Sequence, residues 1–161
     1  MDKIITPDLM RFIYEQYRLH WEGVHGYEHW VRVRERGLVL AQETGACPTI
    51  VSLFAFLHDC ARWDDFHDVD HGPRAAALVP GLNGQYFDLS AEQEAILVEA
   101  IAGHTVRQWH DDPTIATCWD ADRLDLIRLG IRPKPECLST EAAKRWSLEL
   151  AASLGGNPPE K

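Results

Sequence analysis

One apolar run dominates this sequence: Ile50-Val51-Ser52-Leu53-Phe54-Ala55-Phe56-Leu57. It follows Pro48-Thr49, and proline at the first helical position is a typical helix start. A helix that is apolar nearly all round belongs in the centre of a helical bundle. The pair His58-Asp59 comes directly after the run. A buried aspartate at that place needs a cation or several hydrogen-bond donors, because an unpaired buried charge is costly.

Helical patterns on both sides of this run predict an all-α fold. Caps, apolar spacing and breakers place further helices at about residues 7–20, 27–43, 73–79, 91–102, 113–129 and 140–154. A turn cluster is expected at residues 80–84, and residues 155–161 are expected to fray. No segment alternates with period two over a useful length, so we expect a helical bundle without a sheet.

Length and composition fit one globular domain over residues 1–161. The chain has 161 residues, of which 45% are hydrophobic and 25% charged. The formal net charge of −9 argues against a nucleic acid polymer as partner, because such proteins carry a basic face. A small phosphorylated substrate is compatible with this net charge, because a metal and a few arginines can make one pocket locally positive.

Export and membrane insertion are not expected. The N-terminal residues lack the basic and long apolar regions of a signal peptide, and no stretch reaches the ~20 apolar residues that cross a bilayer. The four cysteines are scattered, without a Cys-x-x-Cys pair. This usage predicts reduced thiols in a cytoplasmic protein. The oligomeric state stays open.

Two histidines and two aspartates are the candidate metal ligands: His29, His58, Asp59 and Asp122. They are far apart along the chain, each within a stretch with a helical pattern. Imidazole nitrogens and carboxylate oxygens together form a mixed set suited to a divalent metal. A water at an open position of such a metal has a lowered pKa and is a nucleophile at neutral pH. The pattern indicates a metal-dependent hydrolase.

Three blocks carry a family resemblance: His29-Trp30-Val31-Arg32-Val33, Leu57-His58-Asp59 and Asp120-Ala121-Asp122-Arg123-Leu124-Asp125. In this order, over about residues 20–130, they resemble the HD superfamily of metal-dependent phosphohydrolases. Residues 70–76, Asp-His-Gly-Pro-Arg-Ala-Ala, look like a segment of one uncharacterised branch of that family. The resemblance implies an HD-type helical domain that hydrolyses phosphoric esters or anhydrides. It also implies that His29 is the first metal ligand and that Asp122, directly before Arg-Leu, is the last.

Four further side chains are candidates for the chemistry of phosphate hydrolysis. Arg32 lies three residues after His29, on nearly the same helix face, and Arg62 lies three residues after Asp59. Either guanidinium would suit phosphoryl oxygens by bidentate hydrogen bonding. In related hydrolases, acids a few residues past the His-Asp pair position or deprotonate the attacking water. Asp64 and Asp65 are therefore both candidate general bases.

His71 and His104 leave the number of metal ions open. Some HD proteins hold two or three metals with extra histidines between the His-Asp pair and the last aspartate. His71 comes only twelve residues after Asp59, which is closer than we expect for such a histidine. We therefore expect these two histidines to line the pocket, binding phosphate or acting as acid and base. One divalent ion (Mn, Ni, Co, Mg, Fe or Zn) is favoured, and a second ion stays open.

The remaining polar residues near these motifs have ordinary explanations. Asp120 points away from Asp122 on a helix, so we expect it to support the site or to pair with an arginine. Asp125 is expected to be a solvated acid. His25 lies in a glycine-rich loop and ranks below His29 as a ligand.

The function predicted from these residues is hydrolysis of a nucleotide or another small phosphate ester. Two alternatives follow from the same resemblance. The spare histidines permit a di-iron oxygenase, which metal analysis would reveal. A non-catalytic nucleotide-sensing module would bind nucleotides without turnover, although a complete ligand set speaks against it.

Overall fold

The computed structural model describes residues 3–153 and confirms the all-α, single-domain prediction. Its helices are α1 (Pro7–Gln16), α2 (Tyr27–Thr44), α3 (Pro48–Leu57), α4 (His71–Ala76), α5 (Val79–Leu82), α6 (Ala91–Gly103), α7 (Pro113–Leu124) and α8 (Glu141–Ser153), with short 3₁₀ turns η1 (Asp125–Leu129) and η2 (Pro135–Cys137). Within the described range, an isolated bridge between Asn83 and Phe87 is the only β-type pairing.

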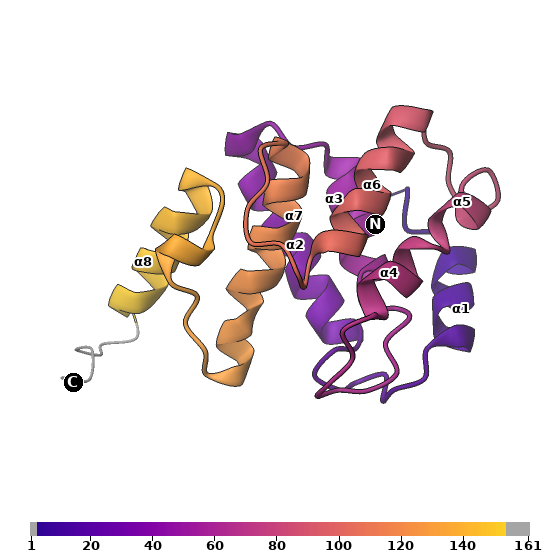
Figure 1. Ribbon diagram of the computed structural model, residues 1–161, viewed down its shortest axis with the longest axis horizontal. Helices are drawn as coiled ribbons and strands as arrows, with labels where there is room; N and C mark the ends of the chain where they lie inside the picture. Colours follow the sequence, from indigo (N-terminus) through magenta and orange to yellow (C-terminus); the bar gives the residue numbers. More distant parts are fainter. Residues whose placement is uncertain (1–2, 154–161) are drawn as a thin grey trace.

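The apolar run forms the central helix. Every residue from Ile50 to Leu57 in α3 is buried. Helices α2, α6 and α7 pack around α3, while α8 lies at one end of the molecule and α1 and α5 at the other (Figure 1). A helix without a polar face has to be surrounded in this way, because any exposed side would leave apolar surface in water.

A glycine allows α2 and α3 to approach closely. A Cβ atom on Gly37 would lie 2.5 Å from the Val51 Cγ1 atom. Gly45 then ends α2 in the left-handed conformation, with φ 74°. The close approach brings the first turn of α2 near the end of α3, where His58 and Asp59 lie.

The first helix is shorter than the sequence predicts. It was expected to reach about His20, but it ends at Gln16 because Tyr17 adopts an extended conformation. The chain then turns, and the rings of Tyr17 and Trp21 pack edge-on against Trp30 at 5.1 and 5.3 Å between centroids. Burial of aromatic surface against α2 outweighs continuation of the helical pattern.

The segment after the His-Asp pair also differs from expectation. In place of one helix at 73–79 and a turn at 80–84, the chain forms α4 and then α5, which takes up Pro80–Leu82. Val79 and Leu82 are buried, and this burial explains why the predicted turn is partly helical. The expected helices at 27–43 and 91–102 are confirmed, the latter with a capping box at Ser90.

The last helix, expected at 140–154, is α8, and the prediction of a frayed segment at 155–161 lies outside the described residues. All four cysteines are free thiols, as expected. Between residues 3 and 153, no helix combines the length and apolarity needed to span a membrane.

Candidate metal centre

The four predicted ligands come together from three helices. His29 lies in the first turn of α2, His58 and Asp59 at the end of α3, and Asp122 in the last turn of α7. The His29 Nε2 atom is 3.2 Å from the His58 Nε2 atom and 3.3 Å from an Asp122 oxygen. One Asp59 oxygen lies 3.8 Å from His29 Nε2 and 3.6 Å from His58 Nε2. These spacings are those of ligand atoms that share one ion.

Hydrogen bonds behind both imidazoles fix which nitrogen faces the site. The His58 Nδ1 donates to the carbonyl oxygens of Phe54 and Ala55, at 3.1 and 3.0 Å. The His29 Nδ1 donates to an Asp125 oxygen at 2.7 Å. Each Nε2 therefore faces the other across the site, at 3.2 Å, where both nitrogens can turn toward one cation. The donor set fits a metal ion, since ligating histidines are usually held in this way.

Electrostatics also favour a cation at this place. Burial lowers the pKa of His58 to about 4, so its ring is neutral at pH 7 and able to ligate. Burial alone would raise the pKa of Asp122, but the hydrogen bond with His29 and the nearby imidazoles hold it below its usual range. The Asp59 pKa is likewise lowered by the surrounding histidines, against the effect of burial. Two ionised carboxylates, one buried and one largely buried, are stabilised by a positive charge between them.

A second donor set shares Asp59 with the first. The other Asp59 oxygen lies 3.0 Å from the His71 Nε2 atom and 3.7 Å from the His104 Nε2 atom. The two Nε2 atoms are 2.9 Å apart. Both rings are again held from behind, by the Asp68 carbonyl at 2.5 Å and the Ile101 carbonyl at 2.6 Å. The arrangement of the first set is repeated on the other side of one carboxylate.

Close packing of α4 on α6 explains why His71 reaches this place. A Cβ atom on Gly72 would lie 2.8 Å from the Ile101 carbonyl oxygen, so only glycine allows the approach. The twelve-residue spacing, which argued against His71 as a ligand, is therefore no obstacle.

The two predicted phosphate-binding arginines lie in different places. An Arg62 Nη1 atom is 3.3 Å from Asp59 and 3.1 Å from the His71 Nε2 atom, beside the second donor set. Arg32 instead binds Asp125 with two hydrogen bonds, of 2.9 and 3.2 Å. Only Arg62 contacts the candidate ligands directly.

Asp64 and Asp65 have distinct surroundings. Asp64 is exposed, and one of its oxygens accepts hydrogen bonds from the backbone N–H groups of Phe66 and His67, at 2.6 and 2.8 Å. Asp65 is 2.9 Å from the His25 Nδ1 atom, and the His25 ring lies 6.4 Å from the His29 ring. Asp64 stabilises a turn of the loop, whereas Asp65 contacts His25, whose ring lies near the candidate ligand His29.

The expectation for Asp125 is wrong, and Asp120 has a role that was not expected. Asp125 is not solvated: its side chain is fully buried and contacts His29 and three arginines. Its spacing of three residues from Asp122 was the available signal, because such residues share a helix face. The Asp120 carboxylate interacts electrostatically with Arg123, as expected, but its hydrogen bonds go elsewhere. It accepts hydrogen bonds from the N–H groups of Ser139 and Thr140 and so anchors the start of α8.

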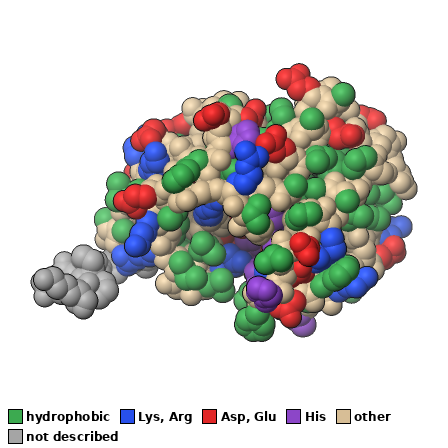
Figure 2. All heavy atoms as spheres, in the orientation of Figure 1, with side chains coloured by type: hydrophobic (Ala, Val, Ile, Leu, Met, Phe, Trp, Pro, Cys, Tyr) green, Lys and Arg blue, Asp and Glu red, His purple; other side chains and the backbone are tan. Residues whose placement is uncertain are grey.

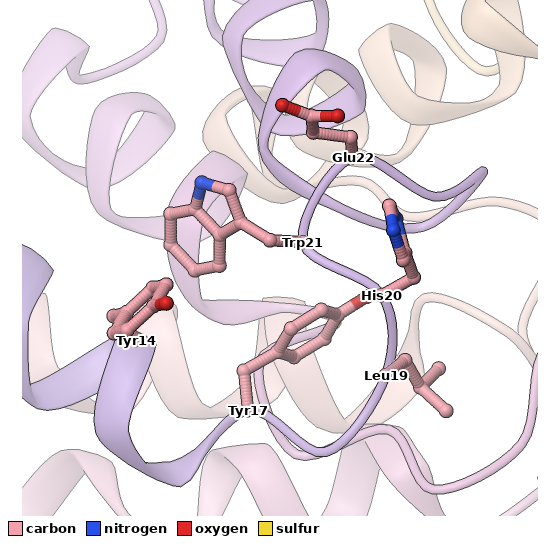
Figure 3. Close-up of a pocket in the computed structure, with 6 residues that line it drawn as sticks. All are labelled: Tyr14, Tyr17, Leu19, His20, Trp21 and Glu22. Carbon is pink, nitrogen blue, oxygen red and sulfur yellow. The ribbon is translucent and has the colours of Figure 1, made fainter.

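The surface of the molecule has two notable features. In the orientation of Figure 1, a hollow lies near the middle of the drawn face, with basic, acidic and histidine side chains around it (Figure 2). A separate pocket of about 550 Å³ lies on the connection from α1 to α2 (Figure 3). It is lined by aromatic and polar side chains: Tyr14, Tyr17, Leu19, His20, Trp21 and Glu22.

Comparison with known proteins identifies the fold. No family model matches this chain, and no curated protein matches it either. Among solved structures, the chain is similar to a predicted HD superfamily hydrolase from an uncultured Thermotogales bacterium. The two are 23% identical, with a TM-score of 0.71, over 91% of this chain and 85% of that chain. The protein therefore shares the fold of that structure. Its own His/Asp groups could hold a metal ion.

Proposed function

We propose that this protein is a metal-dependent phosphohydrolase that acts on a nucleotide or another small phosphate ester. The observation that carries the proposal is the convergence of His29, His58, Asp59 and Asp122, with both Nδ1 atoms held from behind. The HD-superfamily fold supports it, because the solved structure with this fold is described as a predicted hydrolase.

Metal binding by this chain is expected at the first donor set. A divalent ion held there would lower the pKa of a coordinated water and so supply a nucleophile at neutral pH. The set formed by Asp59, His71 and His104 supports a second ion, with Asp59 shared between the two. The twelve-residue spacing between Asp59 and His71 in the sequence argued against this arrangement of two ions.

The chain's own residues would bind the phosphoryl group and move protons. In the reaction, the water oxygen forms a bond to phosphorus, the bond from phosphorus to the leaving oxygen breaks, and a proton passes from water to the leaving group. Arg62 uses Nε toward the Asp64 carbonyl and Nη1 toward Asp59 and His71, and its Nη2 group would stabilise the phosphoryl oxygens. The His25–Asp65 pair would accept the proton from water.

The aromatic pocket supports a nucleotide as the substrate. Tyr14, Tyr17 and Trp21 offer ring faces and edges, and Glu22 offers a hydrogen-bond acceptor (Figure 3). Tyr17 packs against Trp30, which follows the candidate ligand His29. A base stacked in this pocket would be held by the same loop that leads to His29.

An activity screen over nucleoside mono-, di- and triphosphates, cyclic nucleotides and simple phosphate esters, with added metals, tests the proposal. We expect His58→Ala and Asp122→Ala to lose both metal and hydrolysis while keeping a helical circular dichroism spectrum. His67→Ala, which changes an exposed histidine, is the control and should keep both. Full hydrolysis by either ligand variant would refute the assignment.

The shared Asp59 also keeps the di-iron oxygenase as a second candidate. Two irons per chain and an optical charge-transfer band would favour the oxygenase. Hydrolysis supported by a redox-inert metal would exclude it as the principal activity.

A further inference from the structure

Three arginines surround a single buried carboxylate behind the candidate metal centre. Arg32 and Arg36 come from one face of α2, and Arg128 comes from η1. Arg32 lies 2.9 Å from Asp125, Arg128 lies 3.3 Å from it, and Arg36 contacts it as well. One negative charge thus faces three positive charges. A carboxylate that needed only structural support would be satisfied by Arg32 and His29.

The arginines keep donors that Asp125 does not use. Arg32 binds Asp125 through Nε and Nη2, and Arg36 through Nη1. Arg128 uses Nε for the Val24 carbonyl and Nη1 for the Asp125 carbonyl, at 3.0 Å each. The Nη1 group of Arg32 and the Nη2 groups of the other two take no part in these contacts. The three side chains are 36%, 18% and 12% exposed, so solvent reaches the cluster.

The cluster is close to the candidate ligands but separate from them. Asp125 binds the Nδ1 edge of His29, whereas the Nε2 edge of the same ring faces the other donors. Asp122, one helical turn before Asp125, is 22% exposed at its side chain. A group bound by the arginines would therefore occupy a position separate from the candidate metal ligands.

We propose that Arg32, Arg36 and Arg128 form an anion subsite for a phosphate group other than the one hydrolysed. Guanidinium groups with paired N–H donors match phosphate oxygens, and Asp125 holds the three heads in place before the anion arrives. The inference rests on the proposed function and narrows it: the substrate carries at least two phosphate groups, as nucleoside di- and triphosphates do.

Calorimetric titration of the full chain with inorganic pyrophosphate, in the presence of a chelator, tests the subsite without any turnover. Arg36→Ala and Arg128→Ala should each weaken binding about tenfold, the loss of one charge-assisted hydrogen-bonded contact. The affinity of Arg36→Lys for pyrophosphate should lie between those of the starting chain and Arg36→Ala. Lysine keeps the positive charge but lacks the paired N–H donors of the guanidinium group. Arg145→Ala is the control: this exposed arginine pairs with Glu43 and should leave binding as it was. Thermal unfolding of each variant checks that it is folded.

The outcomes separate this inference from the proposed function. Absence of pyrophosphate binding, or equal binding by the starting chain and both alanine variants, would overturn the subsite. A loss as large in Arg145→Ala would also overturn it, because the effect would then be one of net charge. If the variants weaken binding but no phosphate ester is hydrolysed, the subsite stands and the proposed function fails. If monophosphates are hydrolysed and the variants bind pyrophosphate as the starting chain does, the proposed function stands and the subsite fails.

Discussion

Asp125 links the candidate metal ligands to the arginines beside them. Its carboxylate orients His29 through Nδ1 and contacts Arg32, Arg36 and Arg128 while fully buried. Burial would raise its pKa, but the hydrogen bonds with His29 and Arg32 lower it to about 2. A carboxylate behind a ligating histidine fixes the ring and increases the basicity of the ligating nitrogen.

Replacement of Asp125 by asparagine should therefore weaken metal binding. We expect Asp125→Asn to lower the affinity for a divalent metal about 10- to 100-fold, the usual effect of losing such a partner. Competition with a chromophoric chelator measures it. Asp64→Asn changes an exposed aspartate and serves as control. Equal affinity in Asp125→Asn and the starting chain would show that Asp125 does not position His29.

The lowered pKa of Asp125 also predicts acid sensitivity. Its carboxyl has a pKa of about 2 in the folded chain and the ordinary value of 3.8 when unfolded. Below about pH 4 the unfolded state binds more protons, so stability present above that pH is lost as the pH falls toward 2. The loss should be about 2 kcal/mol from this group. Denaturant unfolding across this range should show a shallower decline for Asp125→Asn, and parallel declines would contradict the account.

The two candidate general bases can be separated by matched variants. Asp65→Asn should lower kcat about 100-fold or more, because it removes the charge that orients and supports His25. Asp64→Asn should have little effect, since the asparagine oxygen can still accept the two backbone hydrogen bonds. Metal content should stay the same in both. Equal kcat values, or a larger loss in Asp64→Asn, would contradict the assignment.

At the scale of elements, the candidate site is built from helix ends. The first turn of α2, the end of α3 and the last turn of α7 supply its ligands. Small shifts between these helices would separate the donor atoms. The site therefore depends on the close packing of α2 on α3 at Gly37.

Gly37→Ala tests this dependence. The added Cβ atom would meet the Val51 Cγ1 atom at 2.5 Å, and a valine in a packed core has little room to move. We expect the variant to lose about 1–3 kcal/mol of stability and to bind metal more weakly. Gly81→Ala, where no atom lies within 4 Å of the added Cβ, is the control for denaturant unfolding. If Gly37→Ala has the same stability and metal affinity as Gly81→Ala, the close approach of α2 to α3 is not needed for the site.

For the whole molecule, periodicity and local motifs predicted much of the architecture. The apolar run from Ile50 to Leu57 forms the central helix, and the four candidate ligands converge as expected. Both predictions rest on local signals, a helix without a polar face and short motifs in order. The early end of α1 depends on packing of Tyr17 and Trp21 against Trp30, which no local pattern encodes.

The parts that were missed depend on distances between remote segments. Asp125 lies 96 residues from His29 in the chain, and its burial follows from the packing of α2 against α7 and η1. The pairing of His71 with His104 follows from the approach of α4 to α6 at Gly72. Spacing along the chain gave no measure of these distances, and for His71 it was misleading.

The most direct test of the central claim is to locate the metal by anomalous diffraction from crystals grown with manganese. We predict an anomalous peak within about 2.0–2.3 Å of His29 Nε2, His58 Nε2 and oxygens of Asp59 and Asp122. A second peak beside His71 and His104 would support two ions sharing Asp59. Anomalous peaks elsewhere, with none among the four donors, would contradict the account.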